Sequence, residues 1–134
     1  MRVAIIGCGL IGHKRAKALG SAQLVAVADV DPRRAGALAA AYPGCAVETD
    51  PAACVRRTDV DLVIVSTTNN ALAPVTLAAI EAGKHLLVEK PAARCTQELE
   101  PLIAAAHQQH LVVKVGFNHR FHPAFLKARE LVDS

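Results

Sequence analysis

Five apolar runs, several of them rich in β-branched residues, alternate along the chain with alanine-rich stretches. The runs cover residues 2–6, 24–28, 62–66, 85–88 and 111–116, and a weaker run at Ala46-Val47 lies between the second and the third. Because these runs are continuous and do not alternate in polarity, we expect strands that are covered on both faces. The pattern therefore predicts an α/β fold, a doubly wound parallel sheet of six strands in a three-layer α/β/α arrangement.

Capping residues support the expected order of strands and helices. The predicted caps are Asp31 before Pro32, Asp50 before Pro51, Asn69 or Asn70 before a helix over residues 71–82, and Thr96 before a helix over residues 97–108. A polar side chain accepts a hydrogen bond from the first turn, and a proline at the first helical position has no N–H to satisfy. Each strand is thus expected to be followed by a crossover helix.

Length and composition narrow the class of protein. A chain of 134 residues corresponds to one domain, small for an enzyme with separate cofactor and substrate domains. No stretch approaches the roughly 20 uninterrupted apolar residues of a membrane span, and no leader precedes the first strand, so we expect a cytoplasmic protein without a membrane partner. The net charge of +3 comes from scattered basic residues and aromatics make up only 3%, which argues against nucleic acid as a partner.

The first apolar run leads directly into a glycine-rich turn, Gly7-Cys8-Gly9-Leu10-Ile11-Gly12, followed by a helical stretch. In a Gly-x-Gly-x-x-Gly turn the first glycine allows the tight turn, the second lets a pyrophosphate approach, and the third lets the helix pack closely on the strand. The N–H groups at the helix start then face the phosphates. Similar turns also occur at other nucleotide, flavin and methyl-donor sites. The turn therefore predicts a dinucleotide site only together with its context.

Asp29 supplies that context. It follows the second apolar run, 17 residues beyond Gly12, where a carboxylate would accept hydrogen bonds from an adenosine ribose. The alternative is an ordinary carboxylate at a strand end. Asp29 would repel a 2′-phosphate, although the nearby Arg33 and Arg34 are able in principle to clamp one. We predict NAD as the cofactor, with NADP less favoured.

The four cysteines, Cys8, Cys45, Cys54 and Cys95, form no Cys-x-x-Cys pair and have no histidine at metal-ligand spacing. We expect reduced structural thiols and no metal site. Cys8 differs from the others because it lies inside the glycine turn. Alkylation of Cys8 is therefore expected to block cofactor binding.

Polar residues follow two further strands at the carboxyl edge, where open α/β sheets place their ligands. Ser66-Thr67-Thr68-Asn69-Asn70 would line a cofactor cleft, whereas helix capping would explain only one of the five. Glu89-Lys90-Pro91 brings a charged pair to the same edge. A lysine beside a cofactor is able to polarise a substrate hydroxyl or shuttle its proton. The alternative is a solvated Glu–Lys pair in a loop.

Three segments make the chain similar to a known family. They are Gly-Cys-Gly-Leu-Ile-Gly-His at 7–13, Ala-Ile-Glu-Ala-Gly-Lys-His-Leu-Leu-Val-Glu-Lys-Pro at 79–91, and Val-Gly-Phe-Asn-His-Arg-Phe-His-Pro at 115–123. Together they resemble the glucose-fructose oxidoreductase/inositol dehydrogenase/MocA family of NAD(P)-dependent oxidoreductases. The resemblance implies an NAD(P)-binding Rossmann domain over residues 1–120. Residues 121–134 would form a helix leading to a C-terminal substrate domain that is absent from this chain.

The resemblance also implies roles for individual residues. Lys90 matches the catalytic lysine of the Glu-Lys-Pro motif, and Asn118 and Arg120 would lie on the substrate side of the cleft. The predicted cofactor-binding residues are Gly7, Cys8, Gly9, Leu10, Ile11, Gly12, Asp29, Ser66, Thr67, Thr68, Asn69, Glu89 and Lys90. Members of this family transfer a hydride between nicotinamide and a sugar, polyol or related hydroxyl or carbonyl substrate.

The chain departs from the family pattern after the fourth strand. Members commonly read Thr-Pro-Asn-His-x-His there, whereas residues 67–72 read Thr-Thr-Asn-Asn-Ala-Leu, so contacts made through those histidines do not carry over. The acid/base histidine of such enzymes belongs to the absent domain. Four histidines near the end of the chain are expected to lie on the surface or cap helices instead: His107, His110, His119 and His122.

We therefore expect a domain that binds cofactor but is largely inactive alone. Apolar surface left by the absent domain is expected to favour self-association, and the full-length protein is expected to form a homo-oligomer through that domain. The alternative is a non-catalytic dinucleotide-sensing or scaffold module.

Overall fold

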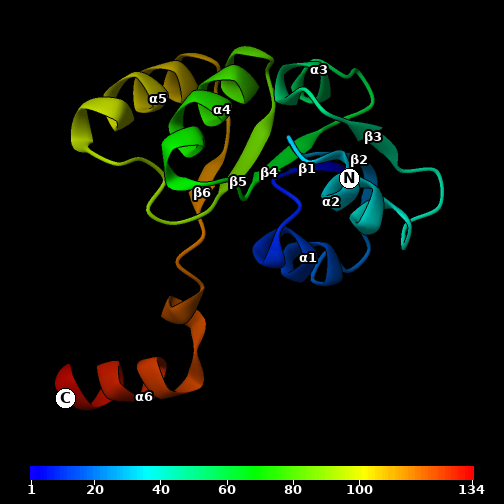
Figure 1. Cartoon of the computed structure of the whole chain (residues 1–134). Helices are drawn as coiled ribbons and strands as arrows, with labels where there is room; N and C mark the ends of the chain where they lie inside the picture. The colour runs from blue at the N-terminus through cyan, green and yellow to red at the C-terminus, as the bar shows by residue number, and fades with distance from the viewer.

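The computed structural model describes all residues, 1–134, and contains one parallel sheet of six strands. The strands are β1 (Arg2–Ile6), β2 (Gln23–Ala28), β3 (Ala46–Glu48), β4 (Leu62–Val65), β5 (His85–Val88) and β6 (Val113–Val115). The helices are α1 (Leu10–Lys17), α2 (Pro32–Ala39), α3 (Pro51–Val55), α4 (Asn69–Glu81), α5 (Thr96–Gln108) and α6 (Pro123–Val132), with a 3₁₀ turn η1 (Asn118–Phe121). The strand order β3-β2-β1-β4-β5-β6 is that of a doubly wound sheet, which confirms the predicted fold class (Figure 1).

Helices cover the sheet on both sides. In Figure 1, α3, α4 and α5 lie on one side and α1 with α2 on the other. Successive strand residues point to opposite faces, so neighbours such as Ile5 and Ile6 enter two different hydrophobic clusters. Both residues are buried, as are Val27, Val65 and Ile80. Burial on both faces is the physical reason for the continuous apolar runs.

Two of the predicted caps are confirmed. Asp31 accepts a hydrogen bond from the N–H of Arg33 at 3.0 Å, and Asp50 accepts one from the N–H of Ala52 at 2.9 Å. Their helices α2 and α3 begin at the prolines that follow. These caps lie between the strand ends and the helices, as the sequence predicted.

The other two caps were predicted wrongly. Thr68 is the N-cap of α4, and α4 already begins at Asn69 because the extended backbone ends at Thr68. Asn70 accepts a hydrogen bond from the Thr68 hydroxyl at 2.7 Å and caps nothing. Similarly, Thr96 is the first residue of α5, and its N-cap is Cys95. In neither helix does a side chain cap the first turn.

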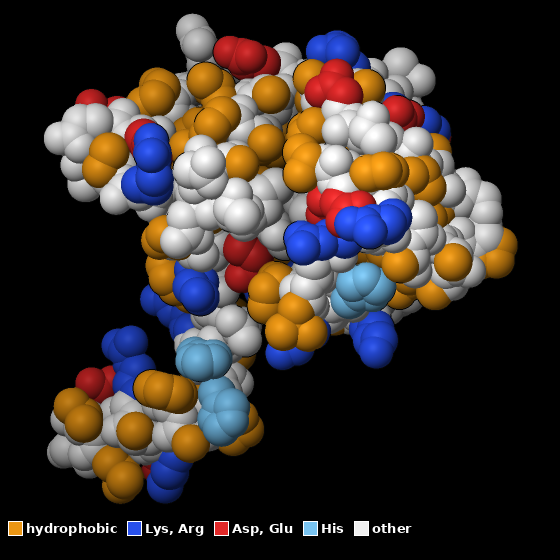
Figure 2. Space-filling view, viewed as in Figure 1, with side chains coloured by type: hydrophobic (Ala, Val, Ile, Leu, Met, Phe, Trp, Pro, Cys, Tyr) orange, Lys and Arg blue, Asp and Glu red, His pale blue; other side chains and the backbone are white.

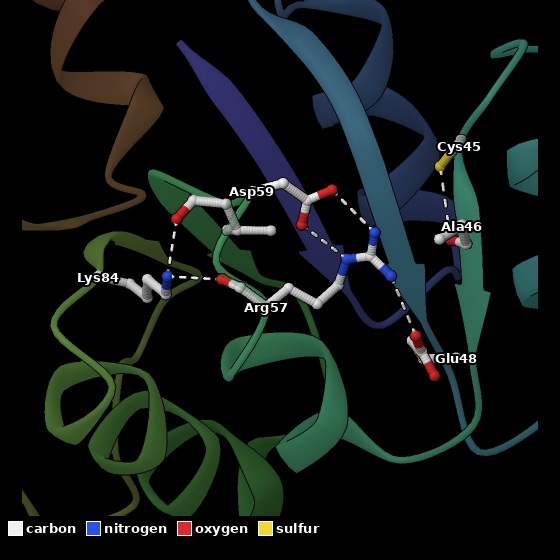
Figure 3. Close-up of polar contacts among 7 residues, drawn as sticks. Cys45, Ala46, Glu48, Arg57, Asp59 and Lys84 are labelled. Carbon is white, nitrogen blue, oxygen red and sulfur yellow. Dashed lines mark hydrogen bonds and ion pairs between the residues drawn. The ribbon is translucent and has the colours of Figure 1, made fainter.

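Charged side chains fix the loop between α3 and β4. The Arg57 guanidinium donates to both oxygens of Asp59, at 2.9 and 2.8 Å, and to Glu48 at the end of β3, at 3.3 Å (Figure 3). From the other side Lys84 donates to the carbonyl of Arg57 at 2.7 Å and to that of Val60 at 2.8 Å. This network is structural, and it ties β3 and the start of β5 to the loop before β4.

The end of the chain stands away from the sheet. In Figure 1 the segment η1–α6 extends from β6, and α6 lies apart from α1–α5. Hydrophobic side chains are exposed along it, as Figure 2 shows, and include Phe121, Phe125, Leu126 and Leu131. None of the helices in the structure has the length and apolar character needed to cross a bilayer.

Candidate functional site

A cleft of about 320 Å³ opens at the carboxyl edge of the sheet, between the ends of β1, β2 and β4. Eight predicted cofactor-binding residues line it: Gly7, Gly9, Leu10, Ile11, Asp29, Ser66, Thr67 and Thr68. Seven further residues complete the lining: Ile6, Ala28, Val30, Arg34, Pro51, Ala71 and Val75. The structure therefore brings the glycine turn, the acid after β2 and the polar segment after β4 to one cavity.

Packing within the protein explains two of the three glycines. Gly7 has a φ of +95°, and a Cβ there would fall on the Ser66 carbonyl and lie 2.7 Å from the Thr67 nitrogen. A Cβ on Gly12 would fall on the Gly7 carbonyl. The Ser66 hydroxyl, in turn, donates to the same carbonyl at 2.7 Å. The turn is thus packed tightly against the ends of β4 and α1.

Gly9 is different because a Cβ there would meet no protein atom within 4 Å. Its backbone is extended, so alanine would fit without strain. Gly9 nevertheless lines the cleft at the N-terminus of α1, where no side chain caps the helix. Uncapped N–H groups at a helix N-terminus are well suited to bind an anion. The open space over Gly9 is the kind of cradle that a phosphate would fill.

Asp29 lines the cleft while remaining 8% exposed. One carboxylate oxygen accepts the N–H of Cys8 at 2.7 Å, and the other accepts the N–H of Asp31 at 2.9 Å. An ionised carboxylate has about four acceptor positions, so two remain for ligand hydroxyls. Asp29 is therefore both a link between the glycine turn and β2 and a hydrogen-bond acceptor at the cleft.

The Cys8 side chain turns away from the cleft. It is 2% exposed, and its thiol donates to the Ala28 carbonyl at 3.4 Å. Burial, assisted by the nearby Asp29 charge, raises the pKa of Cys8 to about 12. The expectation that an alkylating reagent blocks the site through Cys8 is wrong, because a buried, protonated thiol is a poor nucleophile.

The two arginines after Asp29 differ in position. Both pair with Asp31, Arg33 at 3.2 Å and Arg34 at 3.8 Å, but only Arg34 lines the cleft. Sequence reasoning missed Val30, which lines the cleft and is 85% exposed. Val30 could have been found from the sequence, because it is an apolar residue directly after the acid of the dinucleotide motif. Pro51, Ala71 and Val75 gave no comparable signal, because only the tertiary fold brings α3 and α4 to the cleft.

The Glu-Lys-Pro segment is ordered by an ion pair that the sequence did not reveal. Glu89 is buried, and both Nε and Nη2 of Arg15 contact its Oε1. The solvated Glu–Lys pair considered above is therefore wrong. Lys90 is exposed, pairs with no carboxylate and lies outside the lining of the cleft. Cys8, Gly12, Asn69 and Glu89 also fall outside the lining.

The predicted substrate-side residues lie farther along the chain. Asn118 and Arg120 are exposed in η1 and do not line the cleft. His122 caps α6, with its Nδ1 accepting the N–H of Ala124 at 3.2 Å. This is the capping role predicted for a histidine here, and nothing connects His122 to the cleft.

Known proteins resemble this chain in both sequence and structure. A family model described as oxidoreductase family, NAD-binding Rossmann fold, matches residues 1–117. Inositol 2-dehydrogenase 4 of Saccharopolyspora erythraea is 37% identical over 96% of this chain, and the match covers 40% of that protein. The crystal structure of GenD2 from gentamicin A biosynthesis in complex with NAD superimposes with a TM-score of 0.91 at 33% identity, covering 98% of this chain and 38% of GenD2.

A further crystal structure, myo-inositol dehydrogenase from Lactobacillus casei in complex with NAD(H) and myo-inositol, gives a TM-score of 0.90 at 25% identity. This match covers 99% of the chain and 41% of that protein. The chain thus spans about 40% of the length of its relatives. With the family model matching most of its residues, the chain belongs to the glucose-fructose oxidoreductase/inositol dehydrogenase/MocA oxidoreductases and forms their NAD-binding Rossmann domain.

Proposed function

We propose that the cleft holds NAD across the point where the strand order reverses, between β1 and β4. Open α/β sheets bind dinucleotides at this point, outside the carboxyl ends of the strands. The observation that carries the proposal is the contrast among the glycines. Packing requires Gly7 and Gly12, whereas the space over Gly9 is open and lies at the uncapped start of α1. That arrangement fits a pyrophosphate.

The residues of the cleft fit the two halves of the cofactor. Asp29 has free acceptor positions for the adenosine ribose, with Val30 and Arg34 beside it on the same side of the cleft. Thr67 and Thr68 after β4 would follow the cofactor toward the nicotinamide half. Leu10, Ile11 and Ser66 form walls of the site, whereas Cys8, outside the lining, takes part through its backbone N–H, which holds Asp29 in place. Asn69, also outside the lining, would take part as the first residue of α4, next to Thr68. A carboxylate at the ribose favours NAD over NADP.

The reaction is proposed for a longer protein that contains this domain. Bound NAD would supply a nicotinamide that accepts or donates a hydride. Lys90, exposed at the end of β5, would polarise the substrate hydroxyl and hold its proton, with Asn118 and Arg120 on the substrate side. Two of the relatives described above are inositol dehydrogenases, which supports a sugar or polyol as substrate.

We further propose a division between a cofactor domain at residues 1–120 and a segment at residues 121–134 that leads into a substrate domain. The exposed apolar residues of α6 support this division, since a partner domain would cover them. Closing the cleft and excluding water would require that partner. The chain alone is expected to bind cofactor with little turnover and to self-associate through its exposed apolar surface. The full-length protein is expected to form homo-oligomers through the second domain and to act in the cytoplasm.

Calorimetric titration of the chain with NADH and NADPH at one salt concentration tests the proposal. NADH is expected to bind more tightly, with one site per chain, because of Asp29. Gly9→Ala should weaken NADH binding, and Gly36→Ala is its matched control, since Gly36 also has no atom within 4 Å of a Cβ but lies in α2 outside the cleft. Absence of binding for both dinucleotides, in a chain with native circular dichroism, would contradict the assignment.

A further inference from the structure

Glu89 is the most deeply buried carboxylate near the Lys90 segment, at 9% exposure. A charge removed from water in this way is costly unless an opposite charge and hydrogen bonds compensate for it. Arg15, in the last turn of α1, provides the opposite charge and the hydrogen bonds, because two of its guanidinium nitrogens contact one oxygen of the Glu89 carboxylate. No other cation pairs with Glu89.

Three elements meet at this pair. Glu89 follows β5 and Gly116 follows β6, and the residues two positions earlier, Leu87 and Lys114, are paired across the sheet. Leu87 packs on the cluster that contains Ala16 of α1, so Glu89 points to the same side of the sheet as α1. The Arg15–Glu89 pair therefore joins α1 to the ends of β5 and β6.

Gly116 leaves just enough room for the pair. A Cβ at Gly116 would lie 3.0 Å from Nη2 of Arg15 and 3.0 Å from each carboxylate oxygen of Glu89. The backbone N–H of Gly116 donates to the Val88 carbonyl at 2.8 Å, so the glycine has little freedom to move away. The ends of β5 and β6 thus leave room for the ion pair, and a side chain at position 116 would press on both of its members.

We propose that Arg15 is a positioning residue that holds, through Glu89, the segment carrying Lys90 in place relative to the glycine turn. Helix α1 begins in that turn and carries Arg15 in its last turn, so one rigid element connects the proposed phosphate site, through Glu89, to the Lys90 segment. The Glu89 backbone is fixed on both sides, donating to the Val65 carbonyl and accepting from the Ala92 N–H, both at 2.9 Å.

The inference rests on the proposed NAD site, and its consequence is specific to one half of the cofactor. NADH reaches the strand end that carries Lys90, whereas ADP contains only the adenosine and the two phosphates. Arg15→Met is expected to weaken NADH binding roughly tenfold, the effect of losing one charged hydrogen bond, and to change ADP binding by less than about twofold. Arg15→Lys should restore part of the NADH affinity, because the charge returns without the two-nitrogen contact.

Gly116→Ala provides a second variant should Arg15→Met fold poorly. It removes no charge but presses on both Arg15 and Glu89, so it should also weaken NADH binding while leaving ADP binding nearly unchanged. Arg2→Met is the matched control. Arg2 also pairs with a carboxylate, that of Asp61, but this pair lies at the amino-terminal ends of β1 and β4, away from the cleft. Equal losses for NADH and ADP, or no loss for either, would overturn the inference.

Amide hydrogen exchange separates this inference from the proposed function. If the unmodified chain binds neither NADH nor ADP, the NAD proposal fails, but the exchange of residues 89–92 still reports on Arg15. In Arg15→Met the amide hydrogens of Glu89, Lys90 and Ala92 should then exchange faster, Pro91 having none, whereas those of β2 and β3 should exchange at an unchanged rate. Arg15→Lys should exchange more slowly than Arg15→Met over the same residues. Unchanged exchange at residues 89–92 would refute the positioning role by itself.

Discussion

The carboxylate of Asp29 accepts the backbone N–H of Cys8 at 2.7 Å, across the 21 residues that separate them in the chain. The residue expected to select the cofactor therefore also holds the turn expected to bind the phosphates. A substitution at Asp29 acts on both, because the Cys8 N–H is buried and needs an acceptor. Cofactor preference and local stability are coupled at this site.

Asp29→Ser is expected to raise the affinity for NADPH relative to NADH by about tenfold or more, since the charge that repels a 2′-phosphate is lost. The free energy of unfolding should fall by about 1–3 kcal/mol, because the Cys8 N–H loses its acceptor. Calorimetric titration and chemical denaturation measure the two effects. Asp31→Ser is the control, since it removes a neighbouring carboxylate that caps α2. An unchanged affinity ratio would refute the ribose assignment.

Gly9→Ala is expected to separate binding from stability. The new Cβ meets no protein atom within 4 Å, so the free energy of unfolding should change by no more than about 1 kcal/mol. The same Cβ would occupy the space proposed for the pyrophosphate, so NADH affinity should fall by at least about tenfold. Titration with NADH and urea denaturation of the same sample measure both quantities.

Gly12→Ala is the contrasting variant for this test. Its Cβ would fall on the Gly7 carbonyl, which is backbone and unable to move aside cheaply. We expect a loss of about 3 kcal/mol or more in stability, with binding lost as a consequence of unfolding. If Gly9→Ala lowered the free energy of unfolding as much as Gly12→Ala, that result would contradict the open space over Gly9.

The reactivity of the four cysteine thiols should decrease as their burial increases. Burial raises the pKa of Cys8 and of Cys54 to about 12, so only about 10⁻⁴ of either thiol is ionised at pH 8. Cys95 is exposed and should react first, followed by the half-buried Cys45. Timed alkylation followed by peptide mass spectrometry gives the order. Rapid labelling of Cys8 in the folded chain would show that the turn opens readily.

The Arg2–Asp61 pair should make stability depend on acid pH. Hydrogen bonds from the side chain and backbone of Arg2 lower the pKa of Asp61 from 3.8 to about 2. A folded-state pKa below the unfolded one gives stability that is present above pH 3.8 and is lost as the pH falls toward 2. Asp61→Asn should thus be slightly less stable at pH 7, and most of this difference from the unmodified chain should be lost by pH 2. Denaturation at both values tests this, and a constant difference would contradict it.

The fold was predictable from the sequence because its signals are local. Continuous apolar runs mark strands covered on both faces, and Asp31 with Pro32 or Asp50 with Pro51 marks the start of a helix within two residues. The exact starts of α4 and α5 were not predictable, because the backbone turns helical directly after the preceding segment, and neither start is fixed by a side-chain cap.

The site was predictable only in part. The glycine turn, the acid after β2 and the polar segment after β4 could be assigned to one site from the amino-acid pattern, because each follows a strand and parallel strands bring their carboxyl ends to one edge. Three further features became visible in the folded chain alone: Asp29 holds the Cys8 N–H, Cys8 is buried, and Arg15 pairs with Glu89. These contacts join residues 21 and 74 positions apart. No local pattern encodes such pairs, because they depend on how α1 crosses the sheet and on which charges its packing removes from water.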